Sequence, residues 1–150
     1  MGQILQAPHR FENSADYQKP AIFLAGGISS CDNWQLSTAR SIAGKSCLNV
    51  FNPRREGDFA KTGDEAAAQI RWEYEHLNAA EMVLFWFPST SVCPIALYEL
   101  GRIIHSNKIL YIGVDFNYPR RFDVIEQAWL ASSTYVIYNT LDSMVEEIIG

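Results

Sequence analysis

The sequence predicts an α/β fold: a five-stranded parallel sheet with helices on both faces, in a single domain. Short continuous apolar runs alternate with helix-like segments along the chain, and most of these runs end in residues that are typical of turns. Parallel neighbours need crossover connections, so this alternation favours a flavodoxin-like or Rossmann-like three-layer sandwich. With 150 residues the chain is long enough to bury a core.

The first strand is expected only after a polar segment. Residues 1–19 are polar and aperiodic, and we expect an N-terminal arm there, followed by one domain over residues 20–150. The apolar run 21–25 then ends in Gly26 and Gly27. A buried strand that runs into a tight turn has this pattern.

The later elements follow the same alternation. Asp32 and Asn33 offer caps for a helix that closes at Gly44, and Asp64 offers one for a long helix. Pro94 suits the first turn of another helix. The remaining predictions are strands at 47–51, 82–87, 108–114 and 134–138, and helices at 64–80, at 122–132 and through Met144 and Ile148.

This architecture places a functional site at one edge of the sheet. In open α/β sheets, ligands bind beyond the carboxyl ends of the strands, near the point where the strand order reverses. Glu99 lies one turn into the helix that follows the strand at 82–87, and a carboxylate there is placed to act as a nucleophile or a proton donor. The alternative is an acid that pairs with Arg102 on a solvent-facing helix.

Other residues at this edge suit a phosphate or a base. Arg54 and Arg55 follow a strand, and arginine forks suit phosphates and carboxylates, although solvated loop charge is an equal alternative. The turn 26–27 lets backbone amides approach an oxygen ligand, but it matches neither the dinucleotide nor the Walker fingerprint, so a structural turn stays open. Trp34 is either a core residue or a surface for stacking on a base.

The composition bounds the partners of the chain. Its formal net charge of -5 argues against a nucleic-acid polymer, because duplex binding neutralises phosphates with basic residues. Three cysteines without paired spacing suit a reducing compartment, and no apolar run has the length of a signal peptide or a membrane span. We therefore expect a cytoplasmic protein that does not bind membranes. The three histidines lack metal-ligand spacing, and we expect no metal site.

Five motifs in this order make the chain resemble the nucleoside 2-deoxyribosyltransferase-like family over roughly residues 20 to 115. The motifs are Phe23-Leu-Ala-Gly-Gly27, Trp34, Asn52-Pro-Arg-Arg55, Gln69-Ile-Arg-Trp-Glu73 and Pro94-Ile-Ala-Leu-Tyr-Glu-Leu-Gly101. Each is weak alone. Their order and their position at strand ends make the resemblance fairly specific.

The resemblance implies cleavage of the N-glycosidic bond of a 2′-deoxynucleoside or its 5′-monophosphate, with transfer of the deoxyribosyl group to another base or to water. In that family the glutamate of the Glu-Leu-Gly motif attacks the anomeric carbon, which corresponds to Glu99 here, and a second acid assists the departing base, which corresponds to Glu73. A homo-oligomer is implied, and the chemistry requires no cofactor. The substrate-binding candidates are Gly26, Gly27, Ile28, Trp34, Asn52, Arg54, Arg55, Trp72, Cys93 and Pro94.

Two departures from the family pattern keep an alternative open. Phe23 stands where these transferases usually carry a tyrosine that orients the nucleophile, and Cys93-Pro94-Ile95 replaces an acid-glycine-small sequence. Loss of positioning costs rate. The alternative is therefore a nucleotide-binding or sensing module of the same fold with weak or no catalysis. A phosphoribohydrolase ranks last, because its P-G-G-x-G-T signature is missing.

Overall fold

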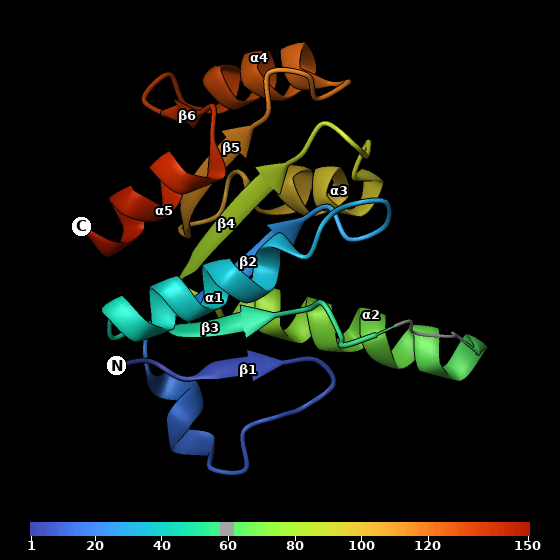
Figure 1. Cartoon of the computed structure of the whole chain (residues 1–150), viewed down its shortest axis with the longest axis vertical. Coiled ribbons are helices and arrows are strands. Elements are labelled where there is room, and N and C mark those ends of the chain that lie inside the picture. The colour runs from blue at the N-terminus through green and yellow to red at the C-terminus, as the bar shows by residue number, and fades with distance from the viewer. Residues whose placement is uncertain (58–61) are drawn as a thin grey trace.

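The computed structural model describes residues 1–57 and 62–150 and confirms the α/β class (Figure 1). All strand pairs are parallel, and the strands lie in the order β1-β3-β2-β4-β5-β6. The strands are β1 (Ile4–Gln6), β2 (Ala21–Gly26), β3 (Asn49–Asn52), β4 (Met82–Phe87), β5 (Ile109–Val114) and β6 (Ile137–Tyr138).

The prediction of five strands is wrong by one. The sixth strand, β1, comes from residues 1–19 and pairs with β3 at the edge of the sheet. It is three residues long and buries only Leu5, so it has no run or alternation that a sequence pattern can reveal. The strand forms because its backbone pairs with that of β3. The predicted strand at 134–138 is correspondingly overestimated, since only Ile137 and Tyr138 pair.

Helices cover both faces of the sheet, as expected (Figure 1). Two helices pack side by side on one face, and three pack on the other, so that two separate apolar clusters form. The first group is α1 (Trp34–Lys45) and α5 (Leu141–Ile149), and the second is α2 (Gly63–Ala79), α3 (Pro94–Ile103) and α4 (Arg121–Ala131). A short 3₁₀ helix, η1 (Ser14–Gln18), follows β1.

The helix starts show how local chemistry sets the boundaries. Thr62, not the expected Asp64, caps α2, because Thr62 and Glu65 form a reciprocal capping box. Asn33 caps α1 through the amide of Leu36, in agreement with the sequence. Helix α3 has proline at its start and no capping side chain. Its first turn therefore leaves backbone amides that a ligand can use.

The strand order reverses between β2 and β4. From β2 the chain goes to β3 on one side, and from β4 it goes to β5 on the other side. Gly26, the last residue of β2, lies opposite Trp86 and has φ of 153°, where a side chain would overlap the Trp86 carbonyl oxygen. A crevice at this point is the expected ligand site of an open α/β sheet.

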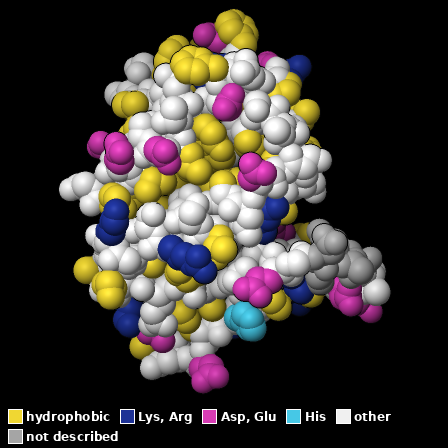
Figure 2. All heavy atoms as spheres, in the orientation of Figure 1, with side chains coloured by type: hydrophobic (Ala, Val, Ile, Leu, Met, Phe, Trp, Pro, Cys, Tyr) yellow, Lys and Arg dark blue, Asp and Glu magenta, His cyan; other side chains and the backbone are white. Residues whose placement is uncertain are grey.

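Charged side chains of both signs are dispersed over the face shown in Figure 2, with hydrophobic side chains between them. Within residues 1–57 and 62–150, no helix combines the length and the apolar character that crossing a bilayer requires.

Candidate active site

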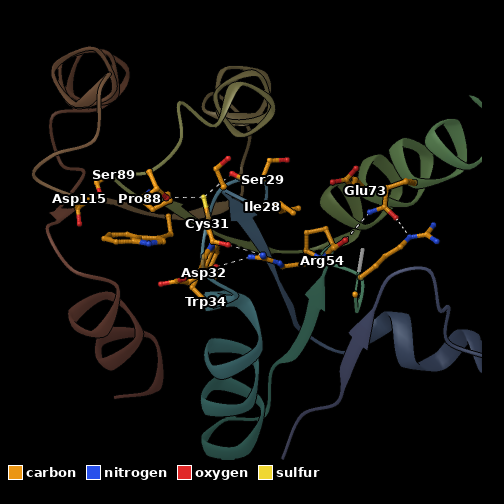
Figure 3. A pocket seen from close by; sticks show the side chains of 17 residues that line it. Ile28, Ser29, Cys31, Asp32, Trp34, Arg54, Glu73, Pro88, Ser89 and Asp115 are labelled. Carbon is orange, nitrogen blue, oxygen red and sulfur yellow. Dashed lines mark hydrogen bonds between the residues drawn. The ribbon is translucent and has the colours of Figure 1, made fainter. Parts of the chain in front are cut away.

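Two connected pockets lie at the carboxyl edge of β2 and β4. The larger one, which we call the polar pocket, has a volume of about 790 Å³ and extends from Glu73 on α2 to Asp115 after β5 (Figure 3). The second, the Glu99 pocket, has a volume of about 570 Å³ and lies between α2 and α3. The residues that line both are Ile28, Ser29, Pro53, Gln69 and Glu73.

Helix α3 delivers Glu99 into this site almost completely buried. The side chain lines the Glu99 pocket together with Phe23 and Ala96, and the residue is 9% exposed. No hydrogen-bond donor contacts its carboxyl group in the part of the chain that the structure describes. Burial, with a further contribution from the charge of Glu73, raises the pKa of Glu99 to about 8, while the positive charge of Arg102 acts in the opposite direction.

The alternative interpretation of Glu99 was an ion pair with Arg102, and this ion pair does not form. The guanidinium of Arg102 donates instead to Oδ1 of Asn78 at 2.9 Å and lies over the ring of Tyr74, 4.6 Å from its centroid. Glu99 therefore faces the pocket and not the solvated side of the helix. Its carboxyl group is available to a ligand.

Glu73 is the second acid of the site. It lines both pockets, and its charge acts on Glu99, so the two carboxyl groups are electrostatic neighbours. Glu75, two residues later on α2, instead forms an exposed ion pair with Arg10 at 2.7 Å. Helical geometry separates the two residues, because positions i and i+2 do not share a face.

The loop between β2 and α1 is held by hydrogen bonds to one carbonyl group. The indole Nε1 of Trp34 and Nε2 of Gln35 both donate to the carbonyl oxygen of Gly27, at 2.9 Å each. Trp34 lines the polar pocket, but its indole N–H is already used. These bonds fix the direction of the peptide at the end of β2 and thereby shape the floor of the pocket.

Both predicted arginines line the polar pocket. Arg54 donates from Nη1 to the carbonyl oxygen of Asp32 at 2.8 Å and from Nη2 to that of Cys31 at 2.9 Å (Figure 3). Arg55 donates from Nε to Oε1 of Gln69 at 2.5 Å. Arg54 thus ties the end of β3 to the β2–α1 loop, in addition to bringing positive charge to the pocket.

The structure brings most of the predicted site residues together, but not all of them. Gly26, Gly27, Cys93 and Pro94 line the Glu99 pocket, and Ile28 lines both pockets.

Asn52 and Trp72 line neither pocket. Asn52 is buried, and its Oδ1 accepts a hydrogen bond from the backbone amide of Arg54. Trp72 stacks on His76 within the core and donates from Nε1 to the carbonyl oxygen of His9. Their neighbours in the sequence motifs reach the site, while these two side chains point into the packing behind it.

Several lining residues were not selected from the sequence. They are Gln69, Trp86, Asp115 and the hydroxyl residues of two loops: Ser29, Ser30, Ser89 and Thr90. Gln69 precedes Glu73 by four residues on α2, and this spacing puts both side chains on one helix face. The loop residues follow β2 and β4 directly, so they lie at the edge of the sheet where the sequence predicts the site, although they were not chosen as individual candidates.

Comparison with known proteins agrees with this geometry. The family described as nucleoside 2-deoxyribosyltransferase like matches residues 19–118. Every residue that lines the two pockets lies within the matched range. A search of curated proteins gives no match. The family match covers most of the chain, so this protein belongs to the nucleoside 2-deoxyribosyltransferase-like family.

Proposed function

We propose that this protein cleaves the N-glycosidic bond of 2′-deoxynucleosides or their 5′-monophosphates, with Glu99 as the nucleophile. The observation that carries this proposal is the state of Glu99: a buried carboxyl group that receives no hydrogen bond from the described residues and faces a pocket beside a second acid, Glu73. The pocket lies where the strand order reverses. Family membership supports the same class of chemistry.

The proposed reaction has two steps. In the first, a carboxylate oxygen of Glu99 bonds to C1′ while the bond from C1′ to the base nitrogen breaks and its electron pair leaves with the base. Glu73 hydrogen-bonds or protonates that base. In the second, a base nitrogen or a water molecule attacks C1′ and releases Glu99. Covalent trapping splits a difficult displacement into two easier ones, and a poorly solvated carboxylate stabilises the positive charge that develops at C1′.

The protonation state of Glu99 makes this role testable. Because burial raises the pKa of Glu99 to about 8, the carboxylate form is the minor form at pH 7. Only the carboxylate is a nucleophile, so kcat/KM should rise with pH up to about 8 and then level off. A rate that falls above pH 8 would instead assign Glu99 the role of general acid. Rates measured from pH 5 to 9 distinguish the two.

A direct assay tests the reaction itself. Free base is quantified by chromatography from a panel of deoxynucleosides and their 5′-monophosphates, with and without an acceptor base. Glu99→Gln should lower base release by at least about a thousandfold, as loss of a nucleophile does in other enzymes. Glu126→Gln is the matched control, because Glu126 is exposed on α4 and lines neither pocket. Equal rates in wild type and Glu99→Gln would refute the nucleophile.

Arg55 and the loop hydroxyl groups support a preference for 5′-monophosphates. A guanidinium and several serine and threonine side chains in one pocket match the acceptor oxygens of a phosphate. Arg55→Ala should abolish the preference for thymidine monophosphate over thymidine, while Arg71→Ala, at an exposed position of the same charge, should leave it unchanged. An unaltered preference in Arg55→Ala would exclude this role. Arg54 is less informative, because its removal also releases the β2–α1 loop.

A homo-oligomer in which a second copy covers the Glu99 pocket fits the rim of that pocket. Four apolar side chains on α2 and α3 are more than half exposed there, and such surfaces are common at interfaces: Ile70, Tyr74, Ile95 and Tyr98. Light scattering should give more than one chain per particle for the wild type and should give a monomer for Ile95→Glu/Tyr98→Glu. A wild-type monomer at micromolar concentration would overturn this proposal.

A second function, a binding or sensing module, is favoured by one observation. Phe23 lines the Glu99 pocket and has no hydroxyl group. None of the described residues donates a hydrogen bond to the Glu99 carboxyl group. Calorimetric binding of a deoxynucleotide, together with no base release over a long incubation at high protein concentration, would support the module over the enzyme.

A further inference from the structure

Two cysteine side chains converge at the mouth of the site, although they are far apart in the sequence. A Cβ atom placed on Gly27 would lie 2.5 Å from Sγ of Cys31 and 3.1 Å from Sγ of Cys93. The two sulfur atoms are therefore no farther apart than the sum of these distances. Gly27 separates them without a side chain, and any other residue at this position would displace at least one of them.

The segments that carry the two cysteines already contact each other. Cys31 follows β2, and its sulfur accepts a hydrogen bond from Oγ1 of Thr90, which belongs to the loop after β4, at 3.5 Å. Cys93 ends that loop as the residue before α3. Little movement is therefore needed to bring one sulfur to the other.

The two thiols differ in their access to solvent. Cys31 is partly exposed and lines the polar pocket, so a small oxidant can reach it (Figure 3). Cys93 is buried and has φ of 54°, a left-handed conformation that is uncommon for a residue with a side chain. Strained backbone of this kind is most often found at functional sites. Burial raises the pKa of the Cys93 thiol, which a hydrogen bond with Ser91 partly offsets.

We propose that Cys31 and Cys93 are a redox-sensitive pair that a hydroperoxide converts into an intramolecular disulfide. The Cys31 thiolate attacks the peroxide oxygen, the O–O bond breaks, and Cys31 sulfenic acid and hydroxide form. The Cys93 thiolate then attacks the Cys31 sulfur, the S–O bond breaks, and a second hydroxide leaves with its electron pair. Overall, two thiols and one hydrogen peroxide give one disulfide and two waters, so sulfur is oxidised and peroxide oxygen is reduced.

The disulfide joins the wall of one pocket to the wall of the other. Cys31 lines the polar pocket and Cys93 lines the Glu99 pocket, six residues before Glu99 on the chain. A covalent link between them restrains the loops after β2 and β4, through which a ligand has to enter. The expected effect on base release rests on the proposed function, whereas formation of the bond does not.

The test is a differential thiol assay on the folded, reduced protein. Hydrogen peroxide is added, free thiols are blocked with N-ethylmaleimide in denaturant, and the intact protein and its unreduced peptides are analysed by mass spectrometry. The expected product has lost two hydrogens, carries a maleimide only on Cys47, and yields a peptide that links Cys31 to Cys93. Cys47 is the internal control, because it is exposed and lies before β3, at the opposite edge of the sheet.

Cysteine variants distinguish selective oxidation of the Cys31–Cys93 pair from unselective oxidation of thiols. Cys47→Ser should form the disulfide like the wild type, and Cys31→Ser should form none. In Cys93→Ser, Cys31 should accumulate as a sulfenic acid that dimedone traps. The cross-link in the wild type should form faster as the pH rises from 7 to 9, because the Cys93 thiol has to ionise. Oxidation of Cys47 ahead of the pair, or an irreversibly oxidised Cys31 without a link to Cys93, would overturn the proposal.

An activity readout then addresses regulation. The ratio of base release after and before peroxide should fall in wild type and Cys47→Ser, recover with dithiothreitol, and stay near unity in Cys31→Ser. If the wild type shows no base release at all, the proposed function fails while the mass measurement still decides the disulfide. If the disulfide forms and the ratio stays at unity in all variants, its influence on the site is refuted.

Discussion

Two buried ionisable groups, His76 on α2 and Glu99 on α3, lie in regions of opposite character. His76 is 1% exposed and has a partner for each ring nitrogen: Nδ1 lies 2.7 Å from the carbonyl oxygen of Trp72, and Nε2 lies 3.1 Å from the hydroxyl oxygen of Tyr17. Trp72 also stacks on its ring at a centroid distance of 4.0 Å. Glu99 is almost as buried, and no donor reaches it within the described residues.

The contrast is between a buried group whose hydrogen bonds are complete and a buried group whose desolvation is not compensated. A carbonyl group only accepts hydrogen bonds, so Nδ1 of His76 carries the proton and Nε2 accepts from Tyr17, whose oxygen in turn accepts from the amide of Phe11. This series of hydrogen bonds is complete and attaches the N-terminal segment to α2. The desolvation of Glu99 is not compensated in the same way. A group left in this state destabilises the fold when it is charged, and it is free to act on a ligand.

The largest expected effect concerns the stability cost of Glu99. Its pKa is raised from an unfolded value of 4.5 to about 8 in the folded protein, so its stabilising contribution is complete below pH 4.5 and is lost as the pH rises through 8. Glu99→Gln removes this loss. The free energy of unfolding of the variant, relative to wild type, should increase by on the order of 4 kcal/mol between pH 4.5 and pH 8.5, at about 1.4 kcal/mol per pKa unit.

Urea denaturation at pH 5, 7 and 8.5, with reducing agent, measures this difference. Glu126→Gln should show no such pH dependence. A constant difference between Glu99→Gln and wild type would mean that the carboxylate is solvated, and the contrast with His76 would then disappear.

A smaller loss of stability is expected when the series of hydrogen bonds through His76 is interrupted. Tyr17→Phe leaves Nε2 of His76 and the amide of Phe11 without their partner and should destabilise the fold by about 1–3 kcal/mol. Tyr111→Phe is the control, because the Tyr111 hydroxyl has no hydrogen bond in the part of the chain that the structure describes. Chemical denaturation gives both values. A loss below that of the control would show that the chain of hydrogen bonds contributes nothing to stability.

A fall in pH should reduce the stability of the fold through His76 and not through Glu99. Burial, as the main cause, lowers the pKa of His76 below 6.5, so its contribution to stability is complete above pH 6.5 and is lost as the pH falls through the folded-state pKa. In the same range Glu99 is already protonated in the folded protein and still largely ionised in the unfolded chain, so a falling pH stabilises the fold through this residue. His76→Gln should therefore remove part of the decrease in the free energy of unfolding between pH 6.5 and 5. An identical decrease in variant and wild type contradicts the assignment.

The smallest effect on stability is expected at an exposed contact between the N-terminal segment and α2. Arg10 and Glu75 form an ion pair at 2.7 Å in which both side chains are about half exposed. Such pairs contribute about 0–1 kcal/mol. Arg10→Ala should shift the denaturation midpoint only slightly, and high salt should abolish the shift. A loss as large as that of Tyr17→Phe would show that the N-terminal segment is held by charge and not by the buried chain.

Much of the site could be predicted because it follows from topology. The apolar runs identify the central strands β2, β4 and β5, and parallel strands bring their carboxyl ends to one edge. Glu99 and Glu73 follow from that edge together with the family motifs, and both are found at pockets there. Position along the chain indicated Glu99, because it lies in the helix that directly follows β4, whereas Glu73 lies well inside α2 and was indicated only by the family motif.

Other features could not be read from the sequence, because they depend on pairs of distant residues. The strand β1 exists only beside β3, and Trp72 turns to His76 although the neighbouring Glu73 reaches the pocket. Cys31 and Cys93 have no sequence spacing that suggests a pair, yet they meet at Gly27.

The sequence by itself determined the alternation of strands and helices and the edge of the sheet at which the two pockets lie. These depend on local apolar patterns and on the chirality of crossovers, which hold for any chain of this type. Only the tertiary structure decided which buried polar groups have partners. Hydrogen bonding is short-ranged and directional, so it is settled by the side chains that packing brings within about 3 Å, and the sequence does not encode those distances locally.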